Sequence, residues 1–383
     1  MSALLAAILW VRIGVADAAP ALAVGTARAA RIVGANGLAI PLEPRDRWVA
    51  RADGKALRFE GPSGQWVEVT APARIIGPGP VYAGRHWYRG SLELRVGPAP
   101  AGEAAGSVEV TAIDRLPLEQ YLRGVVPAEM PSSWPLAALE AQAVAARTYT
   151  IAHLGDFAAR GYDLAGSVLS QAYGGLDVEA TASDEAVART AGEILTYAGA
   201  PINAYYCAAA GGYTEDAASV WGFGHKLADG RVVGYPYLKP VADFDWASPH
   251  WSWRTHMSSQ ALAQRLAAAG IGAGTIDSVA IASRSVSGRA AWIAIEGRAG
   301  CREVPGQVFR LALGLQSTLF SLEPAGDGWD VVGRGWGHGV GMSQWGAWQM
   351  ATWGFGFPQI LAHYYPGAKL SLWPGPQGAI SHR

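Results

Sequence analysis

Glu129 is the first residue whose surroundings point to chemistry. It lies in VVPAEMP (125–131), where a carboxylate is placed between apolar residues and two prolines. An apolar environment disfavours the charged carboxylate and raises its pKa, and a general acid that works near neutral pH needs such a shift. The prolines would also restrict how far the carboxyl group can move. The plain alternative is a solvent-exposed glutamate in a turn, where most glutamates lie.

Arg147 is the second candidate, within the stretch PLAALEAQAVAARTYTIAHL (135–154). The alanine-rich middle of this stretch predicts a long helix that is largely buried, and a buried arginine requires a partner. Two interpretations remain open. One is a structural ion pair with Glu140 or Glu129, and the other is the binding or orientation of a carboxylate.

The segment GRGWGHGVGMSQWG (333–346) has glycine at every second position from Gly333 to Gly341. Glycine loses the most backbone freedom on folding, so its repetition indicates that something approaches the backbone closely. With a period of two, one side of a strand would carry Arg334, Trp336, His338, Val340 and Met342, and the other side would be bare.

The bare side could meet a ligand or another segment, or the whole stretch could be a tightly packed buried strand. The segment lacks the Lys and Ser/Thr of a phosphate-binding loop and the βαβ context of a dinucleotide site. His338 is as compatible with a structural role as with a catalytic one.

Three other segments are weaker candidates. SQAYG (170–174) places polar groups in a loop, AAAGGYT (208–214) resembles a tight turn, and Tyr237 and Lys239 fall on alternate positions that could face one side. The chain has no GxSxG elbow and no HExxH motif, so neither an α/β-hydrolase nor a metal-dependent hydrolase is supported. Cys207 and Cys301 belong to no CxxC pair and could form one disulfide or stay free.

Composition restricts the partners. The formal net charge is −1 over 383 residues, which gives no electrostatic basis for binding nucleic acid. The chain has 16 Trp against 8 Phe. Tryptophan faces suit stacking on flat apolar surfaces such as sugar rings, although many will be ordinary core residues.

The order of the expected strands and helices along the chain predicts an α+β fold in which a β-rich layer comes first. Short β-like runs separated by Gly and Pro fill residues 10–113, with a loop at Gly97–Gly106. Residues 114–375 read as a mixed α/β region that would hold the candidate catalytic residues. It has a short helix at 117–124, a proline-punctuated connection, the long Ala-rich helix at about 135–154, and later helices near 183–191, 258–269 and 344–351. Residues 376–383 form a tail.

The N-terminus has two interpretations. An apolar run from Ala3 to Val11, followed by the A-x-A-like residues 16–18, predicts a signal peptide of which residues 1–9 would be a remnant. Alternatively, Trp10–Ala16 is the first strand of the folded chain. The apolar run is too short to span a bilayer as a helix, which takes about 20 residues.

Five blocks together resemble the SpoIID/LytB family of bacterial cell-wall proteins, and they occur in that family's order. They are YLRGVVPAEMPSSWPLAALEAQAVAARTYT (121–150), SQAYGG (170–175), AAAGGYTEDAASVWG (208–222), PYLKPV (236–241) and GRGWGHGVGMSQWGAWQMA (333–351). The resemblance runs from roughly residue 10 to residue 370.

The family includes lytic transglycosylases that cut peptidoglycan glycan strands, especially strands stripped of peptide stems. The resemblance implies that Glu129 is the essential glutamate and that Arg147 is the arginine of the AQAVAART helix. It also implies roles near the cleft for Tyr237 and Lys239, and lining roles for Gln171, Tyr173, His338 and Gln344. In such an enzyme the 6-hydroxyl of N-acetylmuramic acid is the nucleophile and a 1,6-anhydro end forms, so one carboxylate suffices where glycosidases commonly use two.

Other family members are described as enhancers of an amidase, so a non-catalytic binding protein is the second function implied. The expected partners are glycan strands and a cell-wall amidase, outside the cytoplasmic membrane. The family often has lysine where this chain has Glu140. If that lysine contacts substrate, the affinity or specificity of this chain for substrate differs from that of the family. Some members bind zinc through Cys and His near the SQAY block, but this chain has Ser170 and no such neighbours, so neither a metal nor a cofactor is expected.

Overall fold

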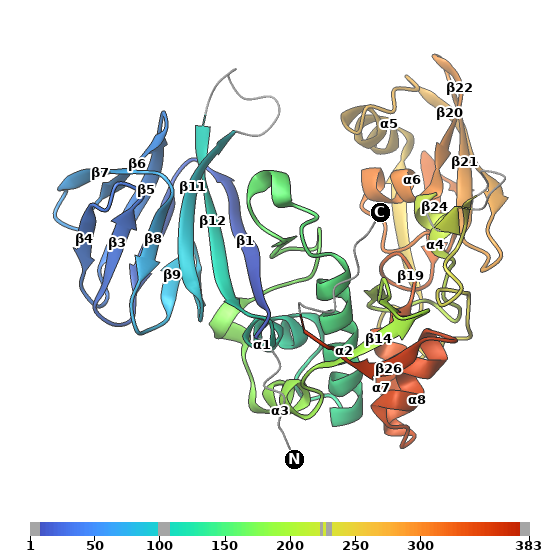
Figure 1. Ribbon diagram of the computed structural model, residues 1–383. Coiled ribbons are helices and arrows are strands. Elements are labelled where there is room, and N and C mark those ends of the chain that lie inside the picture. Colours follow the sequence, from blue (N-terminus) through green and yellow to red (C-terminus); the bar gives the residue numbers. More distant parts are fainter. Residues whose placement is uncertain (1–7, 99–107, 223–224, 227–231, 376–383) are drawn as a thin grey trace. The chain divides into compact units, whose positions relative to one another are not determined.

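Period-two alternation of buried and exposed residues in the N-terminal part of the chain produces two largely antiparallel sheets (Figure 1). In strand β3 (Ala30–Gly34), for example, Ile32 is fully buried while the neighbouring Arg31 points to solvent. The computed structural model describes residues 8–98, 108–222, 225–226 and 232–375. The chain divides into two compact units, residues 1–194 with 371–383 and residues 195–370.

The first sheet has the order β13-β1-β12-β11-β8-β3-β4. Its other strands are β13 (Leu164–Ala165), β1 (Trp10–Ala19), β12 (Val108–Pro117), β11 (Ser91–Pro98), β8 (Ala73–Ile76) and β4 (Ala39–Leu42). The second sheet has the order β10-β9-β2-β5-β6-β7. Its strands are β10 (His86–Tyr88), β9 (Val81–Ala83), β2 (Leu22–Thr26), β5 (Arg47–Asp53), β6 (Ala56–Glu60) and β7 (Trp66–Thr70).

Contacts of β12 with β5 and of β11 with β6 join the two sheets around a shared apolar core. Leu57, Phe59 and Leu94 are fully buried in it. The β-like runs predicted from sequence are 11–16, 22–27, 37–42, 56–61, 65–70, 74–79, 91–96 and 107–113. Each overlaps a strand, and Trp10–Ala16 lies within β1. Strands β3, β5, β9 and β10 were not predicted, because they are either three residues long or interrupted by arginines. Residues 1–7, most of the predicted loop at 97–106 and the tail at 376–383 lie outside the described residues.

Helices α1 (Leu118–Glu129), α2 (Leu136–Ala152) and α3 (Thr181–Arg189) lie where β12 ends (Figure 1). Two short 3-10 helices, η1 (Ala158–Arg160) and η2 (Gly175–Val178), belong to the same unit. Helix α2 is buried along almost its whole length, as its apolar sequence predicts.

The prediction for α1 was wrong at its C-terminal end. The sequence predicts a helix at 117–124 followed by a rigid, proline-punctuated connection that contains Glu129, but α1 continues through Pro127 to Glu129. Proline in the last turn removes only one hydrogen bond and its φ is already helical. Burial of Val125 and Val126 therefore outweighs the cost of that proline.

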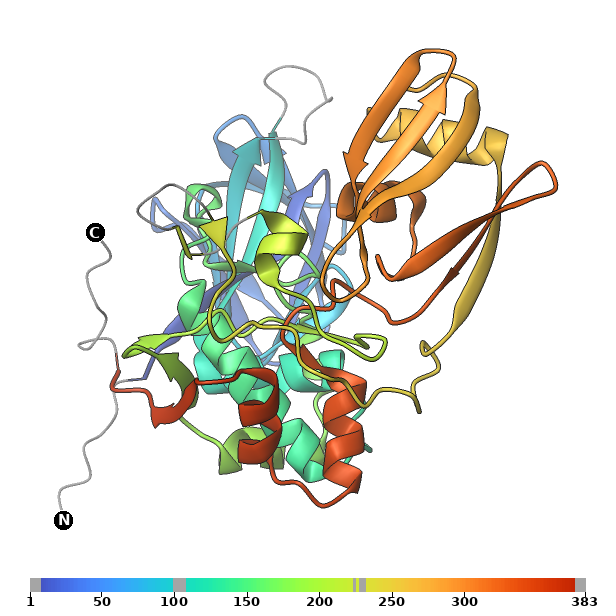
Figure 2. The same ribbon diagram turned by 90° about the vertical axis from the view of Figure 1, so that its right-hand side faces the viewer.

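The second unit is built around two three-stranded sheets, β19-β24-β23 and β20-β21-β22, and two helices (Figure 2). The elements are β19 (Trp253–Ser258), β24 (Gly328–Gly333), β23 (Phe320–Ala325), β20 (Ile276–Arg284), β21 (Ala290–Gly297), β22 (Gly300–Pro305), α5 (Ser259–Ala268) and α6 (Gly306–Leu313). They share one apolar core that includes Leu262, Ile293 and Phe309.

The remaining elements are short strands and three helices. They are β14 (Glu193–Tyr197), β15 (Ala200–Pro201), β16 (Tyr206–Cys207), α4 (Ala217–Trp221), β17 (His225–Lys226), β18 (Val232–Val233), β25 (Met342–Ser343), α7 (Gln344–Thr352), α8 (Phe357–Tyr364) and β26 (Lys369–Leu372). Cys207 is buried, Cys301 is exposed, and both are free, so the disulfide alternative is not realised. Within the described ranges, no helix combines the length and apolar character needed to cross a membrane.

Candidate functional site

Glu129 lies at the C-terminal end of α1 and is partly buried. Its Oε1 accepts a hydrogen bond of 2.7 Å from the backbone N–H of Ala172. Ala172 belongs to the loop 170–173, which follows β13. The fold therefore brings together two of the blocks singled out in the sequence, VVPAEMP and SQAYG, and fixes the orientation of the carboxyl group.

Gln171 and Tyr173 anchor this loop. The Nε2 group of the buried Gln171 donates to Thr150 Oγ1 at 2.9 Å on α2 and to Tyr121 Oη at 3.4 Å on α1. Tyr173 Oη donates to Asp114 Oδ2 at 2.8 Å on β12. Both side chains point into the protein, so they hold the loop that contacts Glu129.

Asp114 is a buried carboxyl at the base of this arrangement. Desolvation raises its pKa to about 7, although the hydrogen bond from Tyr173 acts in the opposite direction. Burial of the Tyr173 phenol, followed by the negative charge of Asp114, raises the pKa of Tyr173 well above its ordinary value. Asp114 was not among the predicted residues, because it stands alone inside a β-strand with no motif around it.

Tyr149 is a second residue that sequence analysis missed. It lies on α2, and its ring stacks on His153 with centroids 4.1 Å apart. Desolvation raises the pKa of the Tyr149 phenol to about 12, and the negative charges of Asp156 and Glu129 add to this effect. Its place two residues after Arg147 in the AARTYT block is the signal that could have indicated it.

Arg147 has a different partner from the two considered in the sequence. Its fully buried guanidinium forms two hydrogen bonds with Glu119 of α1, Nε to Oε1 at 2.8 Å and Nη2 to Oε2 at 2.7 Å. The other N–H groups reach Thr190 Oγ1 and the carbonyl oxygens of Ala143, Val187 and Glu193. Any substrate carboxylate would have to displace one of these partners.

Tyr237, Lys239, His338 and Gln344 belong to the second unit. Tyr237 is buried and its Oη accepts hydrogen bonds of 3.3 Å from the backbone N–H and the Nδ2 of Asn203. Lys239 is exposed and its Nζ lies 3.4 Å from Asp216 Oδ2. The two side chains therefore lie in different surroundings, Tyr237 in the interior and Lys239 at the surface.

The interpretation of the glycine segment as a flat strand was wrong. Gly335, Gly337, Gly339 and Gly341 have φ values of 77°, 108°, 80° and 74°, in the left-handed region that favours glycine. The intervening side chains do not share a face. Trp336 is 45% exposed, whereas Val340 and Met342 are fully buried.

The bare backbone of this segment meets protein. A Cβ atom on Gly335 would lie 2.7 Å from the carbonyl oxygen of Ala209, and one on Gly341 would collide with the carbonyl oxygen of Tyr205. The glycines thus allow residues 334–341 to pack against the AAAGGYT turn and β16.

His338 is held within the same segment. Its Nδ1 accepts a hydrogen bond of 3.0 Å from the Val340 N–H, and its ring lies 5.0 Å from that of Trp221. Desolvation, followed by the charges of Arg310 and Arg289, lowers its pKa to about 3. A neutral imidazole with these contacts favours the structural interpretation. Gln344 is the buried first residue of α7.

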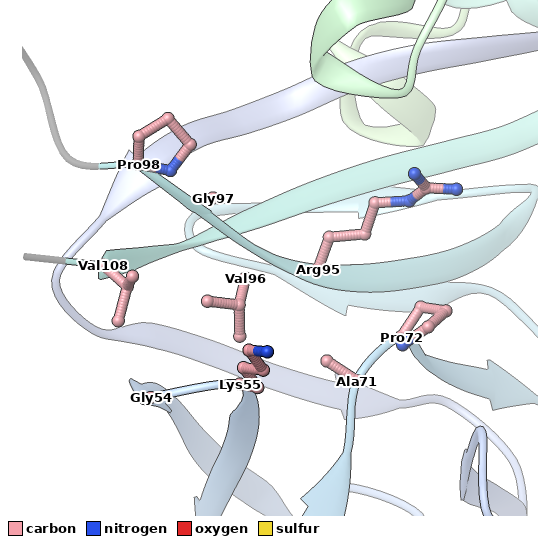
Figure 3. A pocket seen from close by; sticks show the side chains of 9 residues that line it. All are labelled: Gly54, Lys55, Ala71, Pro72, Arg95, Val96, Gly97, Pro98 and Val108. Carbon is pink, nitrogen blue, oxygen red and sulfur yellow. The ribbon is translucent and has the colours of Figure 1, made fainter. Parts of the chain in front are cut away.

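A hollow of about 650 Å³ lies on the first unit, and none of the described residues that line it is a predicted site residue (Figure 3). Its lining comes from the turn at Gly54 and Lys55, the turn at Ala71 and Pro72, Val108 of β12 and the end of β11. None of these described residues carries a carboxyl group, and Arg95 already donates to Glu93 Oε1 at 2.6 Å. The described part of its lining therefore supplies no carboxylic acid that could act as the general acid in glycoside cleavage.

Comparison with known proteins identifies the family. The family model described as "Stage II sporulation protein" (SpoIID) matches residues 107–197, and a domain of unknown function (DUF8618) matches residues 231–341. An uncharacterized protein of Brachyspira hyodysenteriae is 34% identical over 262 residues, which cover 67% of each chain. Stage II sporulation protein D of Bacillus amyloliquefaciens is 32% identical over 276 residues, which cover 68% of this chain and 76% of that protein.

The chain belongs to the SpoIID/LytB family. An amidase enhancer of Bacillus subtilis is also similar, at 29% identity over 289 residues, which cover 65% of this chain and 40% of that protein. Glu129, Arg147, Gln171 and Tyr173 all lie inside the SpoIID match. Within the described part of this SpoIID/LytB chain, no three His, Cys, Asp or Glu side chains gather closely enough to hold a metal ion.

Proposed function

We propose that this SpoIID/LytB protein is a lytic transglycosylase that cleaves the bond between N-acetylmuramic acid and N-acetylglucosamine in peptidoglycan glycan strands stripped of peptide. The observation that carries the proposal is the carboxyl group of Glu129. It is partly exposed at the end of α1 and is oriented by the Ala172 N–H at 2.7 Å. Family membership supports a role in the bacterial cell wall.

The proposed reaction needs one carboxyl group in two states. Glu129 first donates its proton to the glycosidic oxygen as the bond from C1 of muramic acid to that oxygen breaks. The Glu129 carboxylate then accepts the proton of the muramic 6-hydroxyl, whose oxygen bonds to C1 and closes the 1,6-anhydro ring. The Ala172 N–H stabilises the carboxylate that forms between these steps and prevents it from turning away.

Arg147, Gln171 and Tyr173 are positioning residues in this scheme. Arg147 ties α2 to Glu119 of α1, the helix that ends at Glu129. Gln171 and Tyr173 fix the loop that carries Ala172. Tyr237, Lys239, His338 and Gln344 stay candidates for glycan binding, and of these Lys239 is the one with an exposed side chain.

The test is incubation of the purified chain with peptide-free glycan strands, followed by mass spectrometry of the products. We expect 1,6-anhydro-muramic ends with the wild type and none with Glu129→Gln. Glu185→Gln is the matched control, because Glu185 is an exposed glutamate of the same unit that pairs with Arg189. If Glu129→Gln produces anhydro ends as fast as the wild type and Glu185→Gln do, the assignment of Glu129 is wrong.

A second function is favoured by the similarity to an amidase enhancer. In that case the chain binds glycan and accelerates a cell-wall amidase without cutting the strands. Acceleration of a purified amidase by a wild-type protein that yields no anhydro ends would establish this alternative. Either function acts on peptidoglycan, so we propose a location outside the cytoplasmic membrane.

A further inference from the structure

An aromatic surface on the second unit takes no part in the reaction proposed above. It consists of Phe244, Trp246 and Trp353, and we call it the aromatic platform. Trp246 is 49% exposed and Trp353 is 48% exposed. Their ring centroids lie 5.6 Å apart with the planes inclined by 42°, and Phe244 contacts both rings at 6.0 and 5.2 Å.

Alternation in the sequence DFDW (243–246) builds one side of the platform. Asp243 and Asp245 are buried and accept hydrogen bonds from backbone N–H groups, Asp243 Oδ2 from Ala210 at 3.1 Å and Asp245 Oδ2 from Gly211 at 2.6 Å. The residues between and after these aspartates reach the surface, because Phe244 is partly exposed and Trp246 is exposed. Burial of the two aspartates therefore directs Phe244 and Trp246 outwards.

The end of α7 builds the other side. Gly354 has a φ of 88° and donates to the Ala351 carbonyl at 3.0 Å, while Phe355 N–H donates to the Met350 carbonyl at 3.1 Å. These two bonds form a Schellman motif, which closes the helix in a single defined geometry. Trp353 is the C-cap residue of α7 and stands directly before that glycine, so its position is set by this helix end.

The platform is held in place before any ligand arrives. The His363 ring stacks on Phe244 at 5.2 Å and 28°, and His363 Nε2 donates to the Ala242 carbonyl at 2.7 Å. Rings that are already fixed lose little side-chain freedom on binding, which favours affinity. Two adjacent half-exposed indoles on a protein surface indicate a binding site.

We propose that the aromatic platform binds glycan by stacking on the apolar faces of uncharged N-acetylglucosamine rings. The inference rests on the proposed function for its substrate class, and it places a second contact with that polymer on the second unit. None of the three platform residues is charged, which matches a neutral sugar face. A nucleic acid strand would need cations for its phosphates, and the platform supplies none. The indole N–H groups of Trp246 and Trp353 can donate to sugar oxygens at the ring edges.

The test is titration of the full chain with a β-1,4-linked N-acetylglucosamine tetramer, followed by tryptophan fluorescence and calorimetry. Glu129→Gln serves as the background so that binding is measured in a protein that lacks the proposed catalytic carboxyl group. We expect Trp246→Ala and Trp353→Ala each to weaken binding about tenfold, which corresponds to about 1.4 kcal/mol. Trp353→Tyr keeps an aromatic face and should recover most of the affinity.

Trp66→Ala is the matched control, because Trp66 is 55% exposed on the first unit and one of its faces is covered by Arg58 at 4.4 Å. Equal affinity for the tetramer in the platform variants and in this control overturns the proposal. The proposal is also overturned if the tetramer does not bind to the Glu129→Gln protein. It is overturned as well if the platform variants lose only the binding of a purified amidase. If the platform variants lose the tetramer while the wild type yields no anhydro ends from strands, the platform stands and the transglycosylase proposal fails.

Discussion

Arg147 and Glu119 are joined by two hydrogen bonds of 2.8 and 2.7 Å between a fully buried guanidinium and a carboxylate that is 41% exposed. This pair links α2 to α1, and the further contacts of Arg147 with Val187 and Thr190 extend the link to α3 and the residue that follows it. It therefore fixes the helix whose last residue is Glu129.

Removal of the carboxylate should destabilise the first unit. Glu119→Ala leaves the buried Arg147 without its charged partner, and we expect a loss of about 3 kcal/mol in the free energy of unfolding. Glu119→Gln retains one acceptor and should cost about half as much. Urea unfolding followed by circular dichroism measures both. If Glu119→Ala unfolds at the same urea concentration as the wild type, the pair does not hold the helices together.

The buried Asp114 predicts a dependence of stability on pH. Its pKa is raised to about 7 in the folded chain from an ordinary value of 3.8, so the folded state holds a proton that the unfolded state releases. The contribution of Asp114 is therefore fully present below about pH 4 and is lost as the pH rises to about 7. The loss is on the order of 4 kcal/mol.

Asp114→Asn should remove this slope, because the amide cannot ionise and keeps an acceptor for Tyr173. The free energy of unfolding is measured for the variant and for the wild type at pH 5 and at pH 8, and the change between the two pH values is compared for the two proteins. Asp53→Asn, an exposed position at the end of β5, is the control and should leave the wild-type slope unchanged. An Asp114→Asn slope as steep as that of the wild type contradicts the prediction.

The glycine segment predicts a graded response to added side chains. At Gly341, alanine introduces both a left-handed φ and a collision with the Tyr205 carbonyl, and we expect a loss of about 4 kcal/mol. At Gly270 the φ of 77° is similar but no atom lies within 4 Å of the added Cβ, so Gly270→Ala should cost about 1 kcal/mol. Thermal unfolding of the two variants tests the difference. Similar costs at both positions would show that close packing at Gly341 is unimportant.

Gln171 should influence cleavage through the position of Ala172. Gln171→Leu removes the amide that donates to Thr150 and Tyr121, which frees the loop that orients Glu129. If the transglycosylase proposal holds, the rate of anhydro-end formation falls at least about tenfold, because small displacements of reacting groups are costly. Binding of the N-acetylglucosamine tetramer, measured on the same variant, should stay within twofold of the wild type.

Thr150→Val removes the acceptor of the same hydrogen bond and completes a double-mutant cycle with Gln171→Leu. Residues that act through one contact are non-additive, so the double variant should be little slower than either single variant. Independent effects on the cleavage rate that multiply in the double variant would exclude a shared positioning role.

Local patterns in the sequence were sufficient for much of the fold. Period-two runs predicted strands in the N-terminal sheets, and the alanine-rich stretch predicted α2 with its burial, because both depend on residues that are close along the chain. The order of the five motif blocks indicated the family that the comparisons show. The same blocks singled out Glu129, whose catalytic role stays a proposal.

Long-range packing decided the rest. Nothing near Arg147 in the sequence distinguishes Glu119 from Glu140 as its partner, because the choice depends on how α1 and α2 pack. The alternating glycines are compatible with a flat strand when the sequence is considered alone. In the structure these glycines have a left-handed backbone, and the carbonyl groups of Tyr205 and Ala209 lie so close to Gly341 and Gly335 that a Cβ atom would not fit. Side-chain partners and backbone handedness arise from segments far apart in the chain, so only the tertiary structure could reveal them.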